Sequence, residues 1–163
     1  MTNTKPFGAL RPLTNDDARQ LLDWRNSDHV RKFMVNQDLI EWEGHQKWVA
    51  KVVSMPDDYR YYIYEVEGTP TGMIGFYGFD ENRNAEWGLY IGDENDPKGS
   101  GESMCRLALD KFFNELHGES LETFALADNA RAIKLYQKLG FQTIDKGEKN
   151  HHYLKITRAE WQQ

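Results

Sequence analysis

Two glycines separated by one residue, Gly99 and Gly101, stand between a predicted strand and a predicted helix. Such a turn directs several unpaired amide N–H groups and the positive end of the helix dipole toward one point, which suits a phosphate or a diphosphate. Lys98 adds a positive side chain to the same loop. Glycine pairs also make plain tight turns, so this segment alone leaves phosphate binding and a structural turn equally open.

Two common phosphate-binding motifs do not fit these residues. A P-loop has four residues between its first glycine and a Gly-Lys-Ser/Thr triplet, and the chain has no such run. A dinucleotide-binding GxGxxG motif has a third glycine where this chain has Met104. The loop is therefore typical of neither a P-loop NTPase nor a Rossmann domain.

Apolar periodicity predicts the elements that would hold this loop. Thr14 followed by Asp17 is typical of a helix N-cap with an acidic first turn, and Asn129 is a good N-cap for a helix that ends at Gly140. A period of two predicts strands with a turn at Glu67-Gly68. In chain order we expect a strand before residue 14, a helix at 14–25, a turn at 29–34, a helix at 41–53 and strands at 59–67, 70–79 and 85–91. These are followed by a helix behind the glycine loop, a strand at 121–127, a helix at 129–140, and a closing hairpin at 141–145 and 151–157.

Composition limits the class of protein. At 163 residues the chain is a natural size for one domain, and its single cysteine, Cys105, excludes an internal disulfide framework. The first dozen residues lack the apolar run of a secretory signal, so a cytoplasmic protein is expected. No stretch is long and apolar enough for a membrane span, and a net charge of -6 disfavours nucleic acid as the main partner. We expect no membrane or nucleic-acid partner, and a homodimer is left open.

Sequence motifs around the loop resemble a known family. Gly99-Ser100-Gly101 follows the strand AEWGLYIG and precedes ALADNARAIKLYQKLGF at a fixed distance. This arrangement resembles the acetyl-CoA-binding core of the GCN5-related N-acetyltransferases. The resemblance covers roughly residues 8–158. It implies an α/β (α+β) fold with a mixed, mostly antiparallel central sheet of about six to seven strands, flanked by about four helices, in a single domain spanning 1–163.

The front of the chain resembles one branch of that family. The segment LLDWRNSDHVRKFM and the aromatic helix around His45 and Trp48 are similar to the enzymes that acetylate the 4-amino group of a UDP-linked dideoxy amino sugar in pseudaminic acid synthesis. The same segments share features with enzymes that acetylate ribosomal protein N-termini. One departure is Asp96, where the family usually has Arg or Gln.

The resemblance also implies the cofactor and its contacts. Acetyl-CoA is the expected co-substrate, with its diphosphate on the amides of the glycine loop. Asn129 would cap its helix, contact the pantetheine arm, or both. The residues implied to bind acetyl-CoA are Leu89, Ile91, Lys98, Gly99, Ser100, Gly101, Glu102, Ser103, Asn129 and Tyr136.

Acetyl transfer to an amine needs an acid, a base and a stabilised oxyanion. A phenol keeps its proton at neutral pH and can donate it to a departing thiolate; by its place in the family motif Tyr136 is the expected acid, with a core tyrosine as the alternative. Glu86 is the first candidate base, acting through water, and a solvated strand carboxylate is equally open. His45 is the second candidate base, and binding of the nucleotide or simple packing on its aromatic helix is equally open. A backbone N–H near Leu89 or Tyr90 would hold the oxyanion.

The acceptor would lie near the front helices. Arg25 and Arg31 could grip a diphosphate, although arginines near Asp23 and Asp28 often form only surface ion pairs. The residues expected to bind the acceptor are Arg25, Arg31, His45, Trp48 and Tyr90.

No metal is assigned. His151 and His152 alternate across a strand and so cannot converge on one ion. Cys105 is expected to be a small core side chain, since direct transfer in this family needs no acyl-enzyme.

Three functions remain in competition. The first is acetylation of a nucleotide-linked amino sugar, the small-molecule partner that the branch resemblance favours. The second is acetylation of a protein N-terminus or a polyamine, which an acidic protein would suit. The third is a CoA-binding module without catalysis, which Asp96 keeps open.

Overall fold

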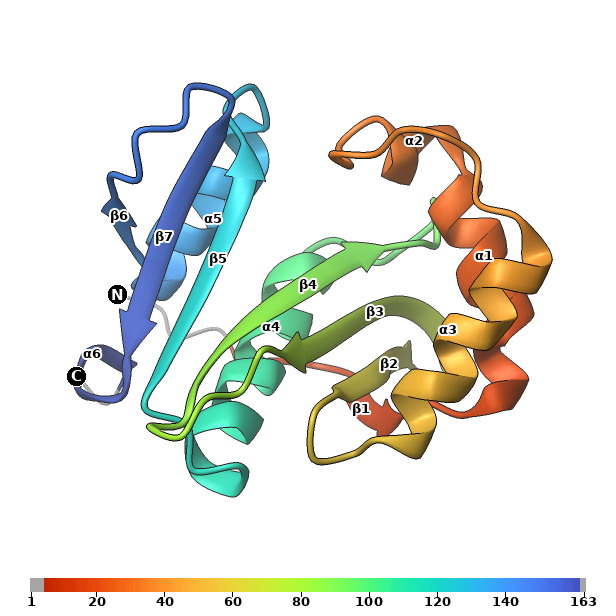
Figure 1. The fold of residues 1–163 in the computed structure, drawn as a ribbon, viewed down its shortest axis with the longest axis horizontal. Helices are drawn as coiled ribbons and strands as arrows, with labels where there is room; N and C mark the ends of the chain where they lie inside the picture. The colour runs from red at the N-terminus through yellow and green to blue at the C-terminus, as the bar shows by residue number, and fades with distance from the viewer. Residues whose placement is uncertain (1–4, 162–163) are drawn as a thin grey trace.

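A seven-stranded mixed sheet organises the molecule. The computed structural model describes residues 5–161, and within them the strand order is β1-β2-β3-β4-β5-β7-β6 (Figure 1). Strands β4 and β5 run parallel, and the other neighbouring strands pair antiparallel, as predicted. The strands are β1 (Ala9–Pro12), β2 (Arg60–Val66), β3 (Thr69–Tyr77), β4 (Asn84–Ile91), β5 (Ser120–Leu126), β6 (Gln142–Ile144) and β7 (His151–Thr157).

Helices cover both faces of the sheet. Helices α1 and α3 lie on one face of the β1–β4 half, whereas α4 and α5 lie on the opposite face, behind the sheet in Figure 1. The sequence did not predict the 3-10 turn before α1, the π-helical continuation of α4, or α6. The helices are η1 (Asn15–Asp17), α1 (Ala18–Asn26), α2 (Asp28–Arg31), α3 (Trp42–Ser54), α4 (Ser100–Asp110), η2 (Lys111–Glu115), α5 (Ala130–Leu139) and α6 (Arg158–Trp161).

Strand alternation separates two hydrophobic cores. Tyr62 and Tyr64 of β2 point into the larger core, under α4 and α5. Ile63, between them, points into the smaller core under α1 and α3. The larger core also holds Cys105, whose thiol is fully buried. Burial raises the pKa of that thiol, so Cys105 is the inert core side chain that we expected rather than a nucleophile.

Close packing fixes α1 against the end of β4. A Cβ atom at Gly92, directly after β4, would lie 2.1 Å from the indole ring of Trp24 on α1. No side chain larger than hydrogen fits there, because real Cβ contacts do not reach this distance. Gly92 therefore lets the ring of Trp24 lie against the backbone where β4 ends.

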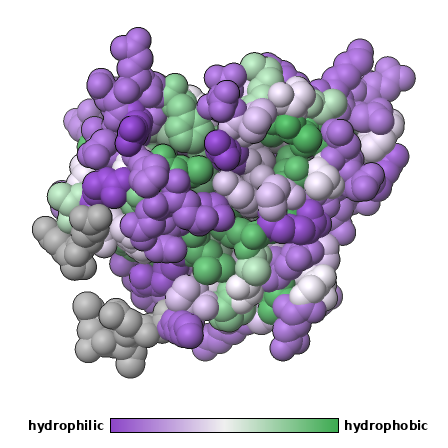
Figure 2. All heavy atoms as spheres, turned by 90° about the horizontal axis from the view of Figure 1, so that it is seen from below, coloured by the Kyte–Doolittle hydropathy of each residue, from purple (hydrophilic) through white to green (hydrophobic). Residues whose placement is uncertain are grey.

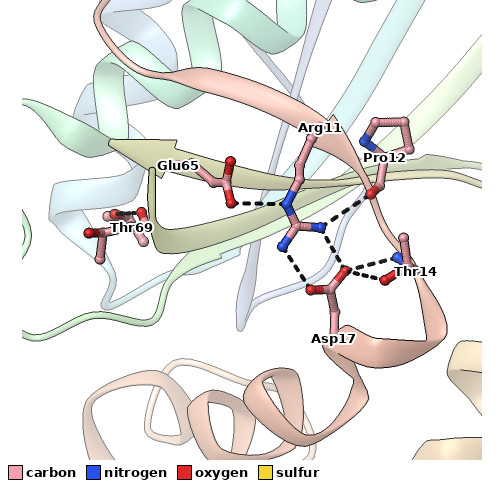
Figure 3. Close-up of polar contacts among 7 residues, drawn as sticks. Arg11, Pro12, Thr14, Asp17, Glu65 and Thr69 are labelled. Carbon is pink, nitrogen blue, oxygen red and sulfur yellow. Dashed lines mark hydrogen bonds and ion pairs between the residues drawn. The ribbon is translucent and has the colours of Figure 1, made fainter. Parts of the chain in front are cut away.

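An arginine ties the start of α1 to the sheet edge (Figure 3). From β1, Arg11 donates through Nη1 and Nη2 to both carboxylate oxygens of Asp17, at 2.9 and 2.8 Å, and through Nε to Glu65 of β2 at 3.0 Å. Asp17 also accepts a hydrogen bond from the amide of Thr14 at 2.8 Å. The predicted Thr14–Asp17 N-terminal signal is confirmed, and Asp17 joins β1, β2 and the first helical turn.

Most of the surface is hydrophilic. The face in Figure 2 shows hydrophobic areas only as small regions between polar residues. Within residues 5–161, the exposed large hydrophobic side chains are Phe33, Val35, Leu39 and Met55, and three of these four lie in the connection between α2 and α3. No helix of this part of the chain has the length and apolarity needed to cross a membrane.

We predict that Asp17→Asn lowers the free energy of unfolding by about 1–2 kcal/mol at about pH 7. Burial works to raise the pKa of the Asp17 carboxyl, but the hydrogen bonds from Arg11 and Thr14 outweigh it and the pKa lies below its ordinary value. The contribution is therefore present above the ordinary pKa of aspartate and is lost as the pH falls through the lowered value. Urea unfolding of both proteins over a pH series measures this gap; a gap that stays constant to about pH 2 would contradict the account.

Candidate active site

Strands β4 and β5 pair over a short stretch and then separate. Their register joins Asn84, Ala85 and Glu86 to residues 120–122 of β5, with no later pair in the described chain. Figure 1 shows the two strands diverging beyond this point. The edge of β4 from Trp87 to Ile91 thus has no strand partner on the β5 side.

Backbone alternation shows which groups of β4 face that opening. The Gly92 N–H donates to the carbonyl of Thr71 at 3.0 Å, across the β3–β4 ladder. Hydrogen-bonded positions recur at every second residue of an antiparallel strand, so the backbone groups of Tyr90 face β3 and those of Leu89 and Ile91 face away from it. Of the two amides expected to meet an oxyanion, Leu89 alone is directed toward the opening.

The glycine loop presents free donors at the start of α4. Gly99 has φ 88°, in the left-handed region, and is the N-cap of α4. The amides of Gly99, Gly101 and Glu102 have no hydrogen-bond partner within residues 5–161. Three unpaired N–H groups at a helix N-terminus can hold a phosphate group. The side chain of Lys98 is exposed beside them.

Two predicted donors of this loop are already used. The Ser100 N–H donates to Pro97 O at 3.1 Å, and the Ser103 N–H donates to Gly99 O at 3.0 Å. The Ser103 hydroxyl accepts from the amide of Phe7. The amides of Ser100 and Ser103 are therefore already bonded within the turn and differ in this from the amides of Gly99, Gly101 and Glu102.

Three elements converge at Gly101. A Cβ atom there would lie 4.0 Å from Cγ1 of Ile91 on β4 and 3.9 Å from Cδ2 of Leu135 on α5. The start of α4 therefore sits between the end of β4 and the side of α5. This places the free loop amides beside the unpaired β4 edge.

Two acidic residues lie near the loop, and one of them, Glu102, is paired with positive side chains. Glu102 Oε1 lies 2.6 Å from Nζ of Lys138 on α5, and its Oε2 lies 3.0 Å from Nε of Arg106. The hydrogen bond from Lys138 is the main cause that lowers the pKa of Glu102. Asp96 is half-buried, and its charge adds to the effect of burial in raising the pKa of Tyr64. Asp96 thus lies near β2.

Helix α5 carries the predicted acid. Asn129 Oδ1 accepts from the Ala132 N–H at 3.3 Å, which confirms the predicted cap. Tyr136 is 6% exposed, and its ring centroid lies 6.0 Å from that of Trp87 on β4. Burial raises the pKa of the Tyr136 phenol above its ordinary value of 10. The phenol is therefore protonated at neutral pH, as a general acid must be.

The two predicted bases lie in different surroundings. Glu86 is exposed on β4, on the same face as Gly88 and Tyr90. His45 is 7% exposed on α3, its Nε2 has no partner within residues 5–161, and burial lowers the pKa of its ring. It packs on Trp48, which packs on Tyr61 of β2. The structure thus places His45 and Trp48 over β2, two strands from Glu86, and does not bring His45 together with the β4 edge.

Of the two predicted acceptor arginines, Arg25 lies near Tyr90, and Arg31 lies near Arg25. Arg25 donates to the carbonyl of Asn36 at 2.7 Å, and its Nη1 is buried with no partner in the described chain. Burial is the main cause that lowers the pKa of Arg25, and the charge of Arg31 also lowers it. Burial raises the pKa of the Tyr90 phenol, and the nearby charge of Arg25 opposes this effect. The expected surface ion pair forms only for Arg31, with Asp28 at 2.9 Å.

The sequence analysis did not assign His29 to this site. His29 of α2 contacts the carbonyl of Ile91 at 3.3 Å, across 62 residues of chain. The motif analysis predicted only a turn at this position. Nothing local in the sequence pairs residue 29 with β4, because the contact depends on how α1 docks.

The two neighbouring histidines of β7 contact different partners. His151 lies 3.5 Å from Glu148, and His152 lies 2.8 Å from the hydroxyl of Thr143. Among residues 5–161 no three His, Cys, Asp or Glu side chains lie together in a way that could hold a metal ion.

Comparison with known proteins agrees with this geometry. The sequence pattern described as "Acetyltransferase (GNAT) domain" matches residues 9–142. The chain is 24% identical over 140 residues to Acetyltransferase PseH of Campylobacter jejuni subsp. jejuni (strain 81-176), covering 86% of each protein.

Two solved structures share the fold. The apo structure of FdhC, described as a nucleotide-linked sugar GNAT, superposes with a TM-score of 0.84 at 20% identity, over 99% of this chain and 93% of that one. The Vibrio cholerae spermidine N-acetyltransferase, in complex with CoA and spermine, superposes with a TM-score of 0.84 at 18% identity, over 95% of this chain and 98% of that one. The family fold expected from the motifs is confirmed. The chain therefore belongs to the GNAT family and is an acetyl-CoA-dependent N-acetyltransferase.

Proposed function

We propose that the acceptor is the amine of a sugar carried on a nucleoside diphosphate, namely the 4-amino group of a UDP-linked dideoxy amino sugar. The observation that carries this proposal is Arg25, which lies near both Tyr90 and Arg31. Arg25 has a buried Nη1 without a partner and pairs with no carboxylate in residues 5–161. A guanidinium nitrogen without a partner favours an anionic ligand such as a phosphate, whose oxygen atoms can accept its hydrogen bonds.

The relatives support the same class of acceptor. The chain is similar to Acetyltransferase PseH over 86% of both sequences, and to a solved nucleotide-linked sugar GNAT over nearly its whole length. Trp48 and His45 lie on α3 next to this region, with His45 buried. We propose that these two side chains line the acceptor site. The proposed base is Glu86 rather than His45.

Acetyl-CoA is proposed to bind in the opening between β4 and β5. Its diphosphate accepts hydrogen bonds from the free amides of Gly99, Gly101 and Glu102, with Lys98 adding charge. The pantetheine arm runs along the backbone groups of Leu89 and Ile91, which have no strand partner on this side. Asn129 caps α5 beside this path.

Transfer is proposed to be direct. The neutral amine attacks the thioester carbonyl, and the Leu89 N–H donates to the oxyanion that forms. As the C–S bond breaks, the Tyr136 phenol gives its proton to the thiolate of CoA. The proton released by the amine passes through water to the Glu86 carboxylate, which is exposed on the acceptor face of β4.

A polyamine is the second candidate acceptor. The net charge of -6 would attract a cationic amine, and the Vibrio cholerae relative is a spermidine N-acetyltransferase solved with spermine. Arg25, near Tyr90, and its neighbour Arg31 would repel such a ligand, which is why the sugar nucleotide is preferred. A module without catalysis is disfavoured because the relatives are acetyltransferases.

The acceptor proposal is tested by measuring thiol release from acetyl-CoA with four amines. A UDP-4-amino-4,6-dideoxy sugar should raise kcat/KM at least about a hundredfold above spermidine or a peptide with an N-terminal alanine. The free 4-amino sugar, without its nucleotide, should have a much higher KM because it cannot engage the arginines. Preferred turnover of spermidine would contradict the proposal and establish the polyamine alternative.

Replacement of the proposed acid tests the mechanism. Tyr136→Phe should lower kcat about 10²- to 10⁴-fold while the Kd for CoA changes less than about twofold, because only the proton donor is removed. The ring still packs on Trp87, so the fold is retained. Steady-state kinetics and calorimetry with CoA measure the two effects. Normal turnover in the phenylalanine variant would exclude Tyr136 as the acid.

The lysine of the glycine loop tests the site of the diphosphate. Lys98→Ala should weaken CoA binding about three- to tenfold, and the difference should shrink as salt is added, since the lysine is exposed. Lys134→Ala, an exposed lysine on α5, is the matched control and should leave the Kd unchanged. Equal effects of the two substitutions in calorimetric titrations would place the diphosphate elsewhere.

A further inference from the structure

Three glycines lie on the face of β3 and β4 that is turned toward α1 and α3. Gly75 of β3 is paired with Gly88 of β4, and Gly92 follows β4 directly. Strand alternation places Gly88 and Gly92 on the same side of β4 as Glu86 and Tyr90. This face therefore carries the proposed base and one of the proposed acceptor residues.

Two of these glycines are required by close packing. A Cβ atom on Gly75 would lie 2.2 Å from the ring of Tyr61, and one on Gly92 would lie 2.1 Å from the ring of Trp24. Real Cβ contacts do not reach these distances. In both places an aromatic ring of this chain occupies the space that a side chain would need.

Packing does not require the third glycine, Gly88. Within residues 5–161, and apart from its chain neighbours, a Cβ atom there would have one neighbour within 4 Å, Cε1 of Tyr77 at 3.8 Å, which is an ordinary contact. The φ angle of Gly88 lies outside the left-handed region, so its backbone conformation does not favour glycine. Glycine inside a strand lowers stability and often marks the close approach of a ligand. Gly88 thus leaves room on β4 that the described chain does not fill.

The surroundings of this open position connect it to the cofactor edge. Along β4 it is flanked by Glu86 and Tyr90, each about 6.6 Å away along the strand. On the β3 side lies the half-buried ring of Tyr77. Burial, with the nearby charge of Glu86, raises the pKa of Tyr77, so these two side chains are neighbours. On the other side the β4–β5 pairing has already ended, and the position adjoins the opening between these strands.

The two faces of β4 have different parts in the proposed reaction. Tyr136, the proposed acid, packs on Trp87 on the side of α4 and α5. Glu86, the proposed base, is exposed on the opposite side. Leu89, whose N–H is proposed to hold the oxyanion, follows Gly88 directly in the chain. An amine that reaches the thioester from the side of the base therefore approaches across Gly88.

We propose that Gly88 is a specificity-determining residue, whose missing side chain lets the part of the acceptor that carries the amine lie directly on the β4 backbone. Under the proposed function, on which this assignment rests, that part is the ring of the amino sugar, with Glu86 at one end and Tyr77 beside it. A side chain at residue 88 would displace the ring from the thioester. It would leave the cofactor edge unchanged, because side chains of a strand point to the faces of the sheet and its edge consists of backbone groups.

Thermal unfolding shows whether the fold needs this glycine. Gly88→Ala fits the available space and restricts the unfolded chain, so Tm should rise by about 1–4 °C. The Kd for CoA, measured by calorimetry, should change less than about twofold. A lower Tm in the alanine variant would mean that the fold itself requires glycine here and would overturn the proposal.

Kinetics measure the effect on the acceptor. The kcat/KM for the UDP-4-amino sugar should fall about tenfold in Gly88→Ala and about a hundredfold in Gly88→Val, because small displacements of reacting atoms are costly. Gly44→Ala on α3 is the matched control, since a Cβ atom there contacts no other element of the described chain. This control should keep kcat/KM within about twofold of wild type. A variant that is more stable yet slower is expected of a glycine that is kept for a ligand.

The outcomes separate the two proposals. Equal kcat/KM in wild type and both Gly88 variants would reject the role of this residue even if the sugar nucleotide is the acceptor. Absence of turnover with the sugar nucleotide would reject the proposed acceptor. The same variants, measured with spermidine or whichever amine the wild-type protein acetylates, would then decide whether that amine lies on Gly88.

Discussion

The separation of two parallel strands is the constraint on which the rest of the site depends. β4 and β5 are held together by three residue pairs and then diverge. Strand edges present backbone N–H and C=O groups that cost free energy when they are buried without a partner. A ligand with amide groups along its length can complete this edge as a strand would. The fold thus leaves the edge of β4 without a strand partner at the place where the chemistry is expected.

Packing on both faces keeps the strands apart. On one face, Trp24 lies directly on Gly92 and holds the end of β4 toward α1. On the other, the start of α4 at Gly101 lies between Ile91 of β4 and Leu135 of α5. The ion pairs of Glu102 join α4 to α5, the helix that carries the proposed acid. The free amides at the start of α4 and the Tyr136 phenol of α5 therefore keep a fixed position relative to each other.

Local signals in the sequence were sufficient for most of the fold. Thr14–Asp17, Asn129 and Gly140 mark helix ends through bonds to residues within a few positions, and the strand alternation from Tyr59 onward predicted the β2–β3 hairpin. The π-helical end of α4 was not predicted, since its sequence keeps the apolar stripe of an α-helix.

The site was predicted less completely because its contacts are long-range. The motif identified the loop, yet the use of the Ser100 and Ser103 amides within the turn depends on the left-handed conformation of Gly99. His45 has the right side chain for a base, but the docking of α3 over β2 buries it two strands from Glu86. His29 reaches β4 only through the packing of α1, and no spacing rule relates residues so far apart in the sequence.

The central claim is that the opening between β4 and β5 receives the cofactor with its diphosphate at the start of α4. A crystal structure of the protein grown with CoA tests this most directly. The account predicts electron density for the diphosphate within hydrogen-bonding distance of the Gly99, Gly101 and Glu102 amides, and for the pantetheine arm along Leu89 and Ile91. Density for CoA on any other part of the surface, with the β4 edge left free, would contradict it.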